Sequence, residues 1–199
     1  MHLFFLCVLL LSAMSAQSIP PPDAPAAEAA FILGERLAAP SSTVKAGYRE
    51  LTWDDLIPDS WNPEQALADI NLDTLSDDDP RAQQALDQLR AMLDSAPAEP
   101  SLEGQKIKLA GFIVPLEYKG DNIHEFLLVP YFGACIHTPP PPANQIVHVF
   151  ASNMPADAEA MTPFWVLGTI KLDHSTSEMG FSSYVMHADK LLPYTEKTQ

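Results

Sequence analysis

Residues 106–132 read KIKLAGFIVPLEYKGDNIHEFLLVPYF, and this stretch decides the fold. Two apolar runs, 106–118 and 125–132, flank a polar turn at 118–122. Both runs are short, rich in β-branched and aromatic residues and bounded by turn residues, which favours strands over helices. Gly111 indicates a bulge or a close backbone approach, and Pro115 indicates a strand edge or end. The stretch therefore predicts two consecutive strands.

Three further strands are predicted downstream, with a polar turn at 173–180 before the last one. They are NQIVHVFAS (144–152), PFWVLGTIKL (163–172) and SSYVMHADKL (182–191). Five short strands joined by turns, with internal glycines and few helix signals between them, favour a small antiparallel β-barrel or sheet. We expect an OB-like arrangement of about five strands.

A helix is predicted upstream of these strands. Asp79 is a plausible N-cap and Pro80 occupies the first helical position, where a missing N–H costs nothing. Apolar residues follow at helical spacing until Pro97 ends the pattern. The predicted fold class is α+β, with the OB-like sheet preceded by a helical N-terminal region. An open sheet with this helix across one face is the alternative.

The first residues have the pattern of a secretory signal. Residues 3–12, LFFLCVLLLS, form an apolar run too short to span a bilayer, and small residues follow it. We assign 1–18 to a signal peptide, 19–47 to a flexible leader and 48–199 to a single globular domain, helical over 48–100 and β-rich over 104–193. The protein is expected to be periplasmic in a Gram-negative bacterium, with no membrane span after signal removal.

The chain is strongly acidic, with 26 Asp and Glu against 11 Lys and Arg and a formal net charge of −15. Removal of 1–18 changes none of these counts, because that segment holds no charged residue of these four types. This balance argues against nucleic acid and anionic membrane surfaces as partners. It suits an exported protein, or one that attracts cations.

Cys135 is the principal candidate for a site. The other cysteine, Cys7, lies in the signal segment, so the mature chain would carry a single thiol. In an extended segment Cys135 and His137 would point to the same side, and a hairpin would bring His148 towards them. One thiolate and two imidazoles suit Zn²⁺, with Cu(I) less favoured. His187 is a candidate fourth donor.

Two other histidines carry weaker expectations. His124, at the turn before the second strand, is a weaker ligand candidate, and His174 is expected to be an exposed loop residue.

Three alternatives to the metal site remain open. Cys135 could instead be a buried, inert thiol, since free cysteine is often buried. It is also readable as the nucleophile of a cysteine-dependent enzyme, with His148 as base and Asn144 as orienting group, although the sequence favours a non-enzyme. The third alternative is a non-catalytic adaptor that docks a partner through a stiff tract and the aromatic residues before it. Its residues are Tyr131, Phe132, Pro139, Pro140, Pro141 and Pro142.

Three segments resemble an uncharacterised bacterial domain-of-unknown-function family of exported proteins. They are TWDDLIP (52–58), GFIVPLE (111–117) and FLLVPYFGACIHTPPPPANQIVHV (126–149). The resemblance rests on Gly133, Cys135, His137, the four prolines, Asn144 and Gln145. It implies no established reaction. Some members look like accessories of ABC-type export or metal-handling systems in zinc-responsive operons. The resemblance therefore implies a metal ion as ligand and an inner-membrane ABC-type transporter or another exported protein as partner.

Overall fold

The computed structural model describes residues 31–37, 47–62, 80–138, 140–155 and 158–195. The predicted signal peptide, Asp79 and Pro139 lie outside these residues. The chain divides into Met1–Ala30 and Phe31–Gln199, and the second unit is described below. Its elements in chain order are β1 (Arg49–Leu51), η1 (Asp54–Leu56), α2 (Pro80–Asp94), η3 (Pro100–Leu102), β2 (Lys106–Lys119), β3 (Asn122–Val129), η4 (Ala143–Gln145), β4 (Val147–Ala151), β5 (Pro163–Ser177) and β6 (Gly180–Pro193).

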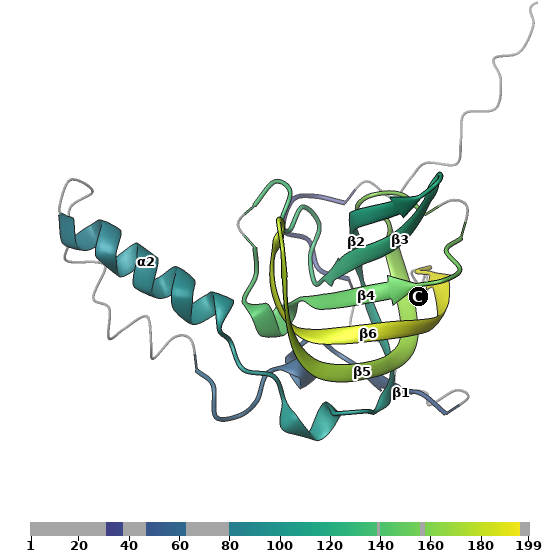
Figure 1. Cartoon of the computed structure of the whole chain (residues 1–199), viewed down its shortest axis with the longest axis horizontal. Helices are drawn as coiled ribbons and strands as arrows, with labels where there is room; N and C mark the ends of the chain where they lie inside the picture. The colour runs from purple at the N-terminus through teal and green to yellow at the C-terminus, as the bar shows by residue number, and fades with distance from the viewer. Residues whose placement is uncertain (1–30, 38–46, 63–79, 139, 156–157, 196–199) are drawn as a thin grey trace, which may run out of the picture. The chain divides into compact units, whose positions relative to one another are not determined.

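A six-stranded sheet dominates this unit, in the order β1-β2-β3-β4-β6-β5 (Figure 1). β2 also pairs with β5, so the pairings of β2, β3, β4, β6 and β5 run in a closed circuit. All pairs in this circuit are antiparallel except β4–β6. The coarse prediction, a small sheet-rich domain with a helix, is confirmed.

The last two strands are longer than the sequence analysis expected. β5 continues to Ser177 and β6 begins at Gly180, so the predicted turn at 173–180 is mostly strand. Ser175 pairs with Ser182 and Ser177 with Gly180. The prediction failed because this part of the hairpin is largely polar and exposed on alternate residues. An antiparallel pair tolerates such residues on its solvent side.

The main core lies along one face of the strands. Phe126, Phe164 and Tyr184 are its large, fully buried side chains, and Leu51 and Leu56 extend it to β1 and η1. The indole of Trp53 packs beside it and donates a 2.7 Å hydrogen bond to the carbonyl of Ala110. Trp53 therefore anchors the segment before α2 to the sheet.

A second apolar cluster, formed by Phe112, Val114, Leu127, Val129, Ala134, Ile146 and Met161, is covered by the segment Phe31–Leu37. The ring of Phe31 meets that of Phe112 edge-on at 5.0 Å and stacks on Phe132 at 6.1 Å. Arg36 forms a β-bridge with Tyr131. Part of the predicted leader therefore packs against the sheet.

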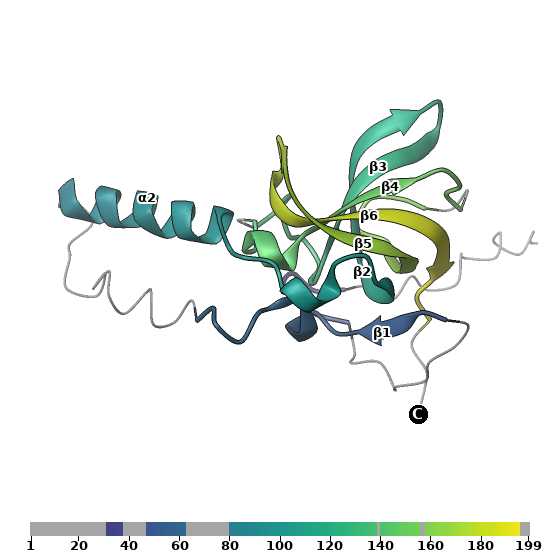
Figure 2. The ribbon, with the colours of Figure 1, turned by 60° about the horizontal axis from the view of Figure 1, so that its bottom comes forward.

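Helix α2 connects to the sheet just beyond its last turn (Figure 2). The carbonyls of Ala96 and Pro97 accept hydrogen bonds from the side chains of Ser183 and Asn144. Among the helix residues whose burial is described, Ala85 is the buried one. No helix in the described part of the chain is both long and apolar enough to cross a membrane.

Candidate functional site

The segment around Cys135 is a turn, and not the extended segment that the sequence predicts. The carbonyl of Gly133 accepts the backbone N–H groups of Ile136, His137 and Thr138. Gly133 has φ +85° and Cys135 has φ +63°, which reverse the chain in left-handed conformations. The alternation that would place Cys135 and His137 on one side is therefore absent here.

Cys135 is half-buried against the second apolar cluster. This burial raises the pKa of its thiol from 9.0 to about 11, so the neutral thiol dominates at physiological pH. Metal coordination and nucleophilic attack both require the thiolate. The surroundings of Cys135 favour the inert-thiol interpretation.

The other residues of the 131–142 segment differ in exposure. His137 and Pro140 are exposed, Pro141 is buried and Pro142 is half-buried. Tyr131 and Phe132, the aromatic residues of the adaptor alternative, are also half-buried, and Phe132 packs edge-on against Phe112 of the second cluster. The described prolines and aromatic residues therefore do not form one continuous exposed surface.

His148 is held on both sides by side chains from two other strands, the adjacent β3 and the more distant β5. It lies on β4, its side chain is 7% exposed, and its Nε2 is 2.7 Å from Oε1 of Glu125 on β3. Its Nδ1 is in hydrogen-bond contact with the hydroxyl of Ser175 on β5. Since a carboxylate can only accept, a neutral His148 carries its proton on Nε2 and presents the Nδ1 lone pair to Ser175.

Glu125 and Ser175 were not singled out by the sequence analysis. The register places Glu125 opposite Phe150, two residues along β4 from His148, which is the diagonal position for a cross-strand pair. Successive side chains of β3 point to opposite faces of the sheet, so the apolar Phe126 indicates that Glu125 lies on the other face. That alternation is a signal in the sequence by which Glu125 could have been found. Ser175 had no such signal, because it fell in the predicted turn.

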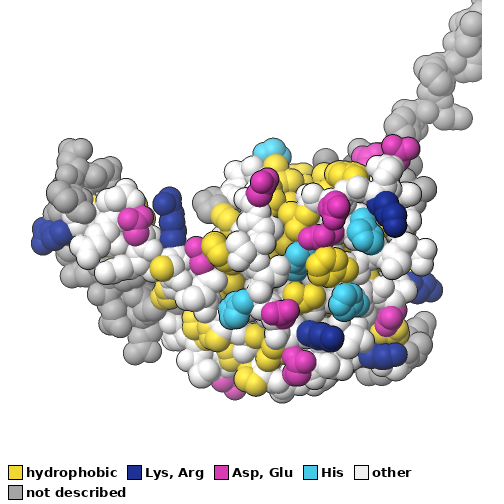
Figure 3. All heavy atoms as spheres, viewed as in Figure 1, with side chains coloured by type: hydrophobic (Ala, Val, Ile, Leu, Met, Phe, Trp, Pro, Cys, Tyr) yellow, Lys and Arg dark blue, Asp and Glu magenta, His cyan; other side chains and the backbone are white. Residues whose placement is uncertain are grey.

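An aromatic stack continues from His148 towards His187. The Phe150 ring lies 4.6 Å from the His148 ring and 5.6 Å from the His187 ring, centroid to centroid. Phe150 and His187 are cross-strand partners on β4 and β6. We call Glu125, His148, Phe150, Ser175 and His187 the histidine face. Figure 3 shows histidines gathered on this side, with acidic and hydrophobic side chains between them.

The predicted ligand set is not assembled as a cluster. Among the described residues, no group of three or more His, Cys, Asp or Glu side chains lies close enough to hold a metal ion. His148 and Glu125 form a contacting pair, and His187 follows beyond the Phe150 ring. Chemically, this arrangement offers an imidazole oriented by a carboxylate, which suits proton transfer or coordination of a cation.

A family model described as "Protein of unknown function (DUF3299)" matches residues 53–193, which include α2, β2–β6 and the whole histidine face. The chain belongs to the DUF3299 family. This confirms the predicted membership of a family of unknown function. A solved DUF3299 family protein (PA4066) from Pseudomonas aeruginosa PAO1 is 38% identical, with a TM-score of 0.59. The match covers 76% of this chain and 99% of that one. No curated protein matches the chain.

The DUF3299 match begins at Trp53, the residue that anchors its segment to Ala110. Phe31–Leu37 precedes the matched span although it covers the second apolar cluster. The cover over Phe112 and Phe132 is therefore supplied, in this DUF3299 protein, by residues outside the family match.

Proposed function

We propose that this DUF3299 protein is an exported, non-catalytic accessory protein that binds a transition metal ion. Zn²⁺ is the expected ion and Cu(I) the less favoured one, and the partner is an inner-membrane ABC-type transporter or another exported protein. The observation that carries the proposal is the hydrogen bond between His148 Nε2 and Glu125, which orients a nearly buried imidazole. Export rests on the signal-like run at residues 3–12.

The chemistry of this pair supports a metal ligand. Metal-binding histidines usually donate their second ring N–H to a carboxylate or carbonyl, which fixes the tautomer and raises the basicity of the binding nitrogen. In His148 that binding nitrogen is Nδ1, now in contact with the Ser175 hydroxyl. A bound ion would take the place of this contact. The net charge of −15 adds a long-range attraction for cations.

The proposed anchor differs from the ligand set that the sequence suggested. Burial and the raised pKa of Cys135 disfavour a thiolate ligand, so His148 rather than Cys135 is the centre of the proposal. A site with few protein ligands exchanges its ion readily, which suits delivery more than storage. His187 remains the candidate for an additional donor.

The topology supports a more specific fold proposal. The closed circuit β2-β3-β4-β6-β5, with its parallel β4–β6 pair, is consistent with an OB-like barrel. OB-folds bind ligands on the face of their second and third strands. Those strands correspond to β3 and β4, which carry Glu125 and His148.

Isothermal titration of the metal-free protein with ZnCl₂ tests the proposal. We expect saturable binding that is lost in His148→Gln and retained in the matched control His174→Gln, whose histidine is exposed on β5. Circular dichroism establishes that both variants are folded. Equal binding by wild type and a folded His148→Gln would overturn the assignment, as would the absence of Zn²⁺ binding in wild type.

One observation favours a second candidate function. Ser175, His148 and Glu125 form a continuous hydroxyl–imidazole–carboxylate chain, the arrangement that activates a serine nucleophile. In an acyl transfer, Ser175 Oγ would attack the carbonyl carbon while its proton moved to His148 Nδ1. That proton would then pass to the leaving group. A fluorophosphonate probe that labels wild type but not Ser175→Ala would support this enzyme, and an unlabelled wild type would exclude it.

A further inference from the structure

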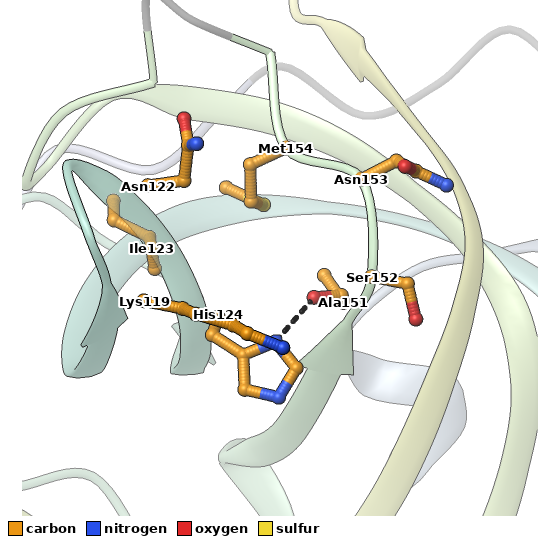
Figure 4. A pocket seen from close by; sticks show the side chains of 8 residues that line it. All are labelled: Lys119, Asn122, Ile123, His124, Ala151, Ser152, Asn153 and Met154. Atoms are coloured by element: carbon orange, nitrogen blue, oxygen red, sulfur yellow. Dashed lines mark hydrogen bonds between the residues drawn. The ribbon is translucent and has the colours of Figure 1, made fainter.

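A hollow opens beside the β2–β3 hairpin, and its lining includes none of the residues of the histidine face (Figure 4). Its volume is about 210 Å³, smaller than the cavities of 300–1,000 Å³ that hold drug-sized ligands. The described residues that line it are Lys119, Asn122, Ile123, His124, Ala151, Ser152, Asn153 and Met154. The size and position suit a small molecule that does not use the histidine face.

His124 presents a defined nitrogen in this hollow. Its Nδ1 lies 3.0 Å from the carbonyl oxygen of Ala151, the last residue of β4. Because a carbonyl can only accept, Nδ1 carries the proton and Nε2 is left as the second polar atom of the ring. Lys119 and His124 both line the hollow (Figure 4), so a cation and an imidazole belong to the same lining.

The charge of the lining contrasts with that of the chain. The chain carries 26 acidic and 11 basic residues, yet the described lining includes one lysine and no aspartate or glutamate. Asn122, Ser152 and Asn153 add amide and hydroxyl donors. The single positive charge of Lys119, with no acidic side chain in the described lining, suits a small anion.

The remaining wall is apolar. Ile123 is 3% exposed and Ala151 2% exposed, and Met154 packs against the main core. A ligand with both an anionic head and a short apolar stem would contact both halves of the lining. A bare inorganic anion would leave the apolar half without contacts.

We propose that this hollow binds a small organic carboxylate, with its carboxylate at Lys119 and its hydrocarbon stem against Ile123 and Met154. The two ends of the ligand have different roles. The charged head gives selectivity for an acid over its amide, and the stem gives selectivity for an organic acid over phosphate. The ligand is small, so saturation is expected at millimolar concentrations.

Titration of ¹⁵N-labelled protein with butyrate, followed by NMR, tests this site. Butyrate is expected to shift the backbone signals of Asn122, His124 and Asn153 in a saturable way. Butyramide, the neutral analogue, is expected to bind at least about tenfold more weakly, as is inorganic phosphate. Equal shifts with butyramide would remove the carboxylate assignment. Shifts as strong with phosphate would remove the role of the stem.

The matched variants are Lys119→Met and Lys171→Met. Lys171 is exposed on β5 and does not line the hollow. Lys119→Met is expected to weaken butyrate binding about tenfold or more, and Lys171→Met to leave it unchanged. Similar binding by both variants, or no saturable shift in wild type, would overturn the proposal. Failure of the carboxylate proposal would not contradict the proposed Zn²⁺ binding at His148, since the two sites share no residue.

Discussion

His148 donates from Nε2 to Oε1 of Glu125 across 2.7 Å, although the two residues are 23 positions apart in the chain. Both belong to adjacent antiparallel strands, and their side chains are 7% and 22% exposed. A partly desolvated carboxylate beside an imidazole fixes which ring nitrogen bears the proton. The pair therefore determines what the opposite ring nitrogen, Nδ1, is able to bind.

Replacement of Glu125 by glutamine tests that relationship. A side-chain amide presents an N–H₂ group as readily as an oxygen, so it no longer holds the proton on Nε2 of His148. Loss of such an orienting partner typically weakens metal binding by about 10–100-fold. Isothermal titration with ZnCl₂ measures the change. Glu117→Gln, at an exposed position on β2, is the control and is expected to bind like wild type.

The reactivity of Cys135 is expected to be low and strongly pH-dependent. In a Cys7→Ala background at pH 7.5, iodoacetamide should react about 100-fold more slowly with the folded protein than with the urea-unfolded chain. This follows from a thiol pKa of about 11 in the fold against the ordinary value of 9.0. The folded rate should keep rising as the pH approaches 11.

The raised pKa of Cys135 also makes the folding stability depend on pH. The folded thiol holds its proton more tightly than the unfolded one, so this contribution to stability is complete below pH 9. It falls as the pH rises through about 11. Equal alkylation rates in the folded and unfolded chains would show that Cys135 is reactive, which would restore the thiolate hypotheses.

Tyr184→Phe is expected to destabilise the protein by about 2–3 kcal/mol. The Tyr184 ring is fully buried, and its hydroxyl donates to the carbonyl of Leu56 at 2.7 Å and accepts the N–H of Glu99. Removal of the hydroxyl leaves two backbone groups without this partner. Urea unfolding measures the loss. Tyr118→Phe, where the ring is 56% exposed, should change the free energy of unfolding little.

Gly168→Ala is expected to cost about 2–3 kcal/mol or more. A Cβ at Gly168 would lie 3.0 Å from the Cα of Ala188 and still closer to the carbonyl oxygen of His187. Both obstacles are backbone atoms of β6, so they cannot rotate away, and β5 and β6 would have to separate. Thermal unfolding measures the effect against Thr169→Ala, a half-buried neighbour. A variant as stable as wild type would show that the strands yield easily here.

The strands themselves were predictable from local patterns. The apolar run at 106–118 coincides with β2, and the run at 144–152 contains β4 after the end of η4, because side-chain alternation and turn residues are read directly from the chain. The ends of β5 and β6 were missed because their polar, exposed residues resemble a loop. The short β1 was missed because three residues give no periodicity.

The site was less predictable than the strands. Cys135 and His137 were chosen from their spacing, but the positive φ of Cys135 and the turn around Gly133 change where their side chains point. His148 was identified, whereas its partners came from β3 and β5. Spacing along the chain does not report which strands become neighbours.

The acidic charge, the order of α2 and β2–β6 and the family of the chain can be read from the sequence, because they depend on composition and on patterns a few residues long. Only the tertiary structure decided that Glu125 and Ser175 flank His148, that Phe31 covers Phe112, and that burial raises the pKa of Cys135. The physical reason is range. Burial and hydrogen-bond partners are set by strand pairing between residues far apart in the chain, and that pairing is fixed when the whole core packs.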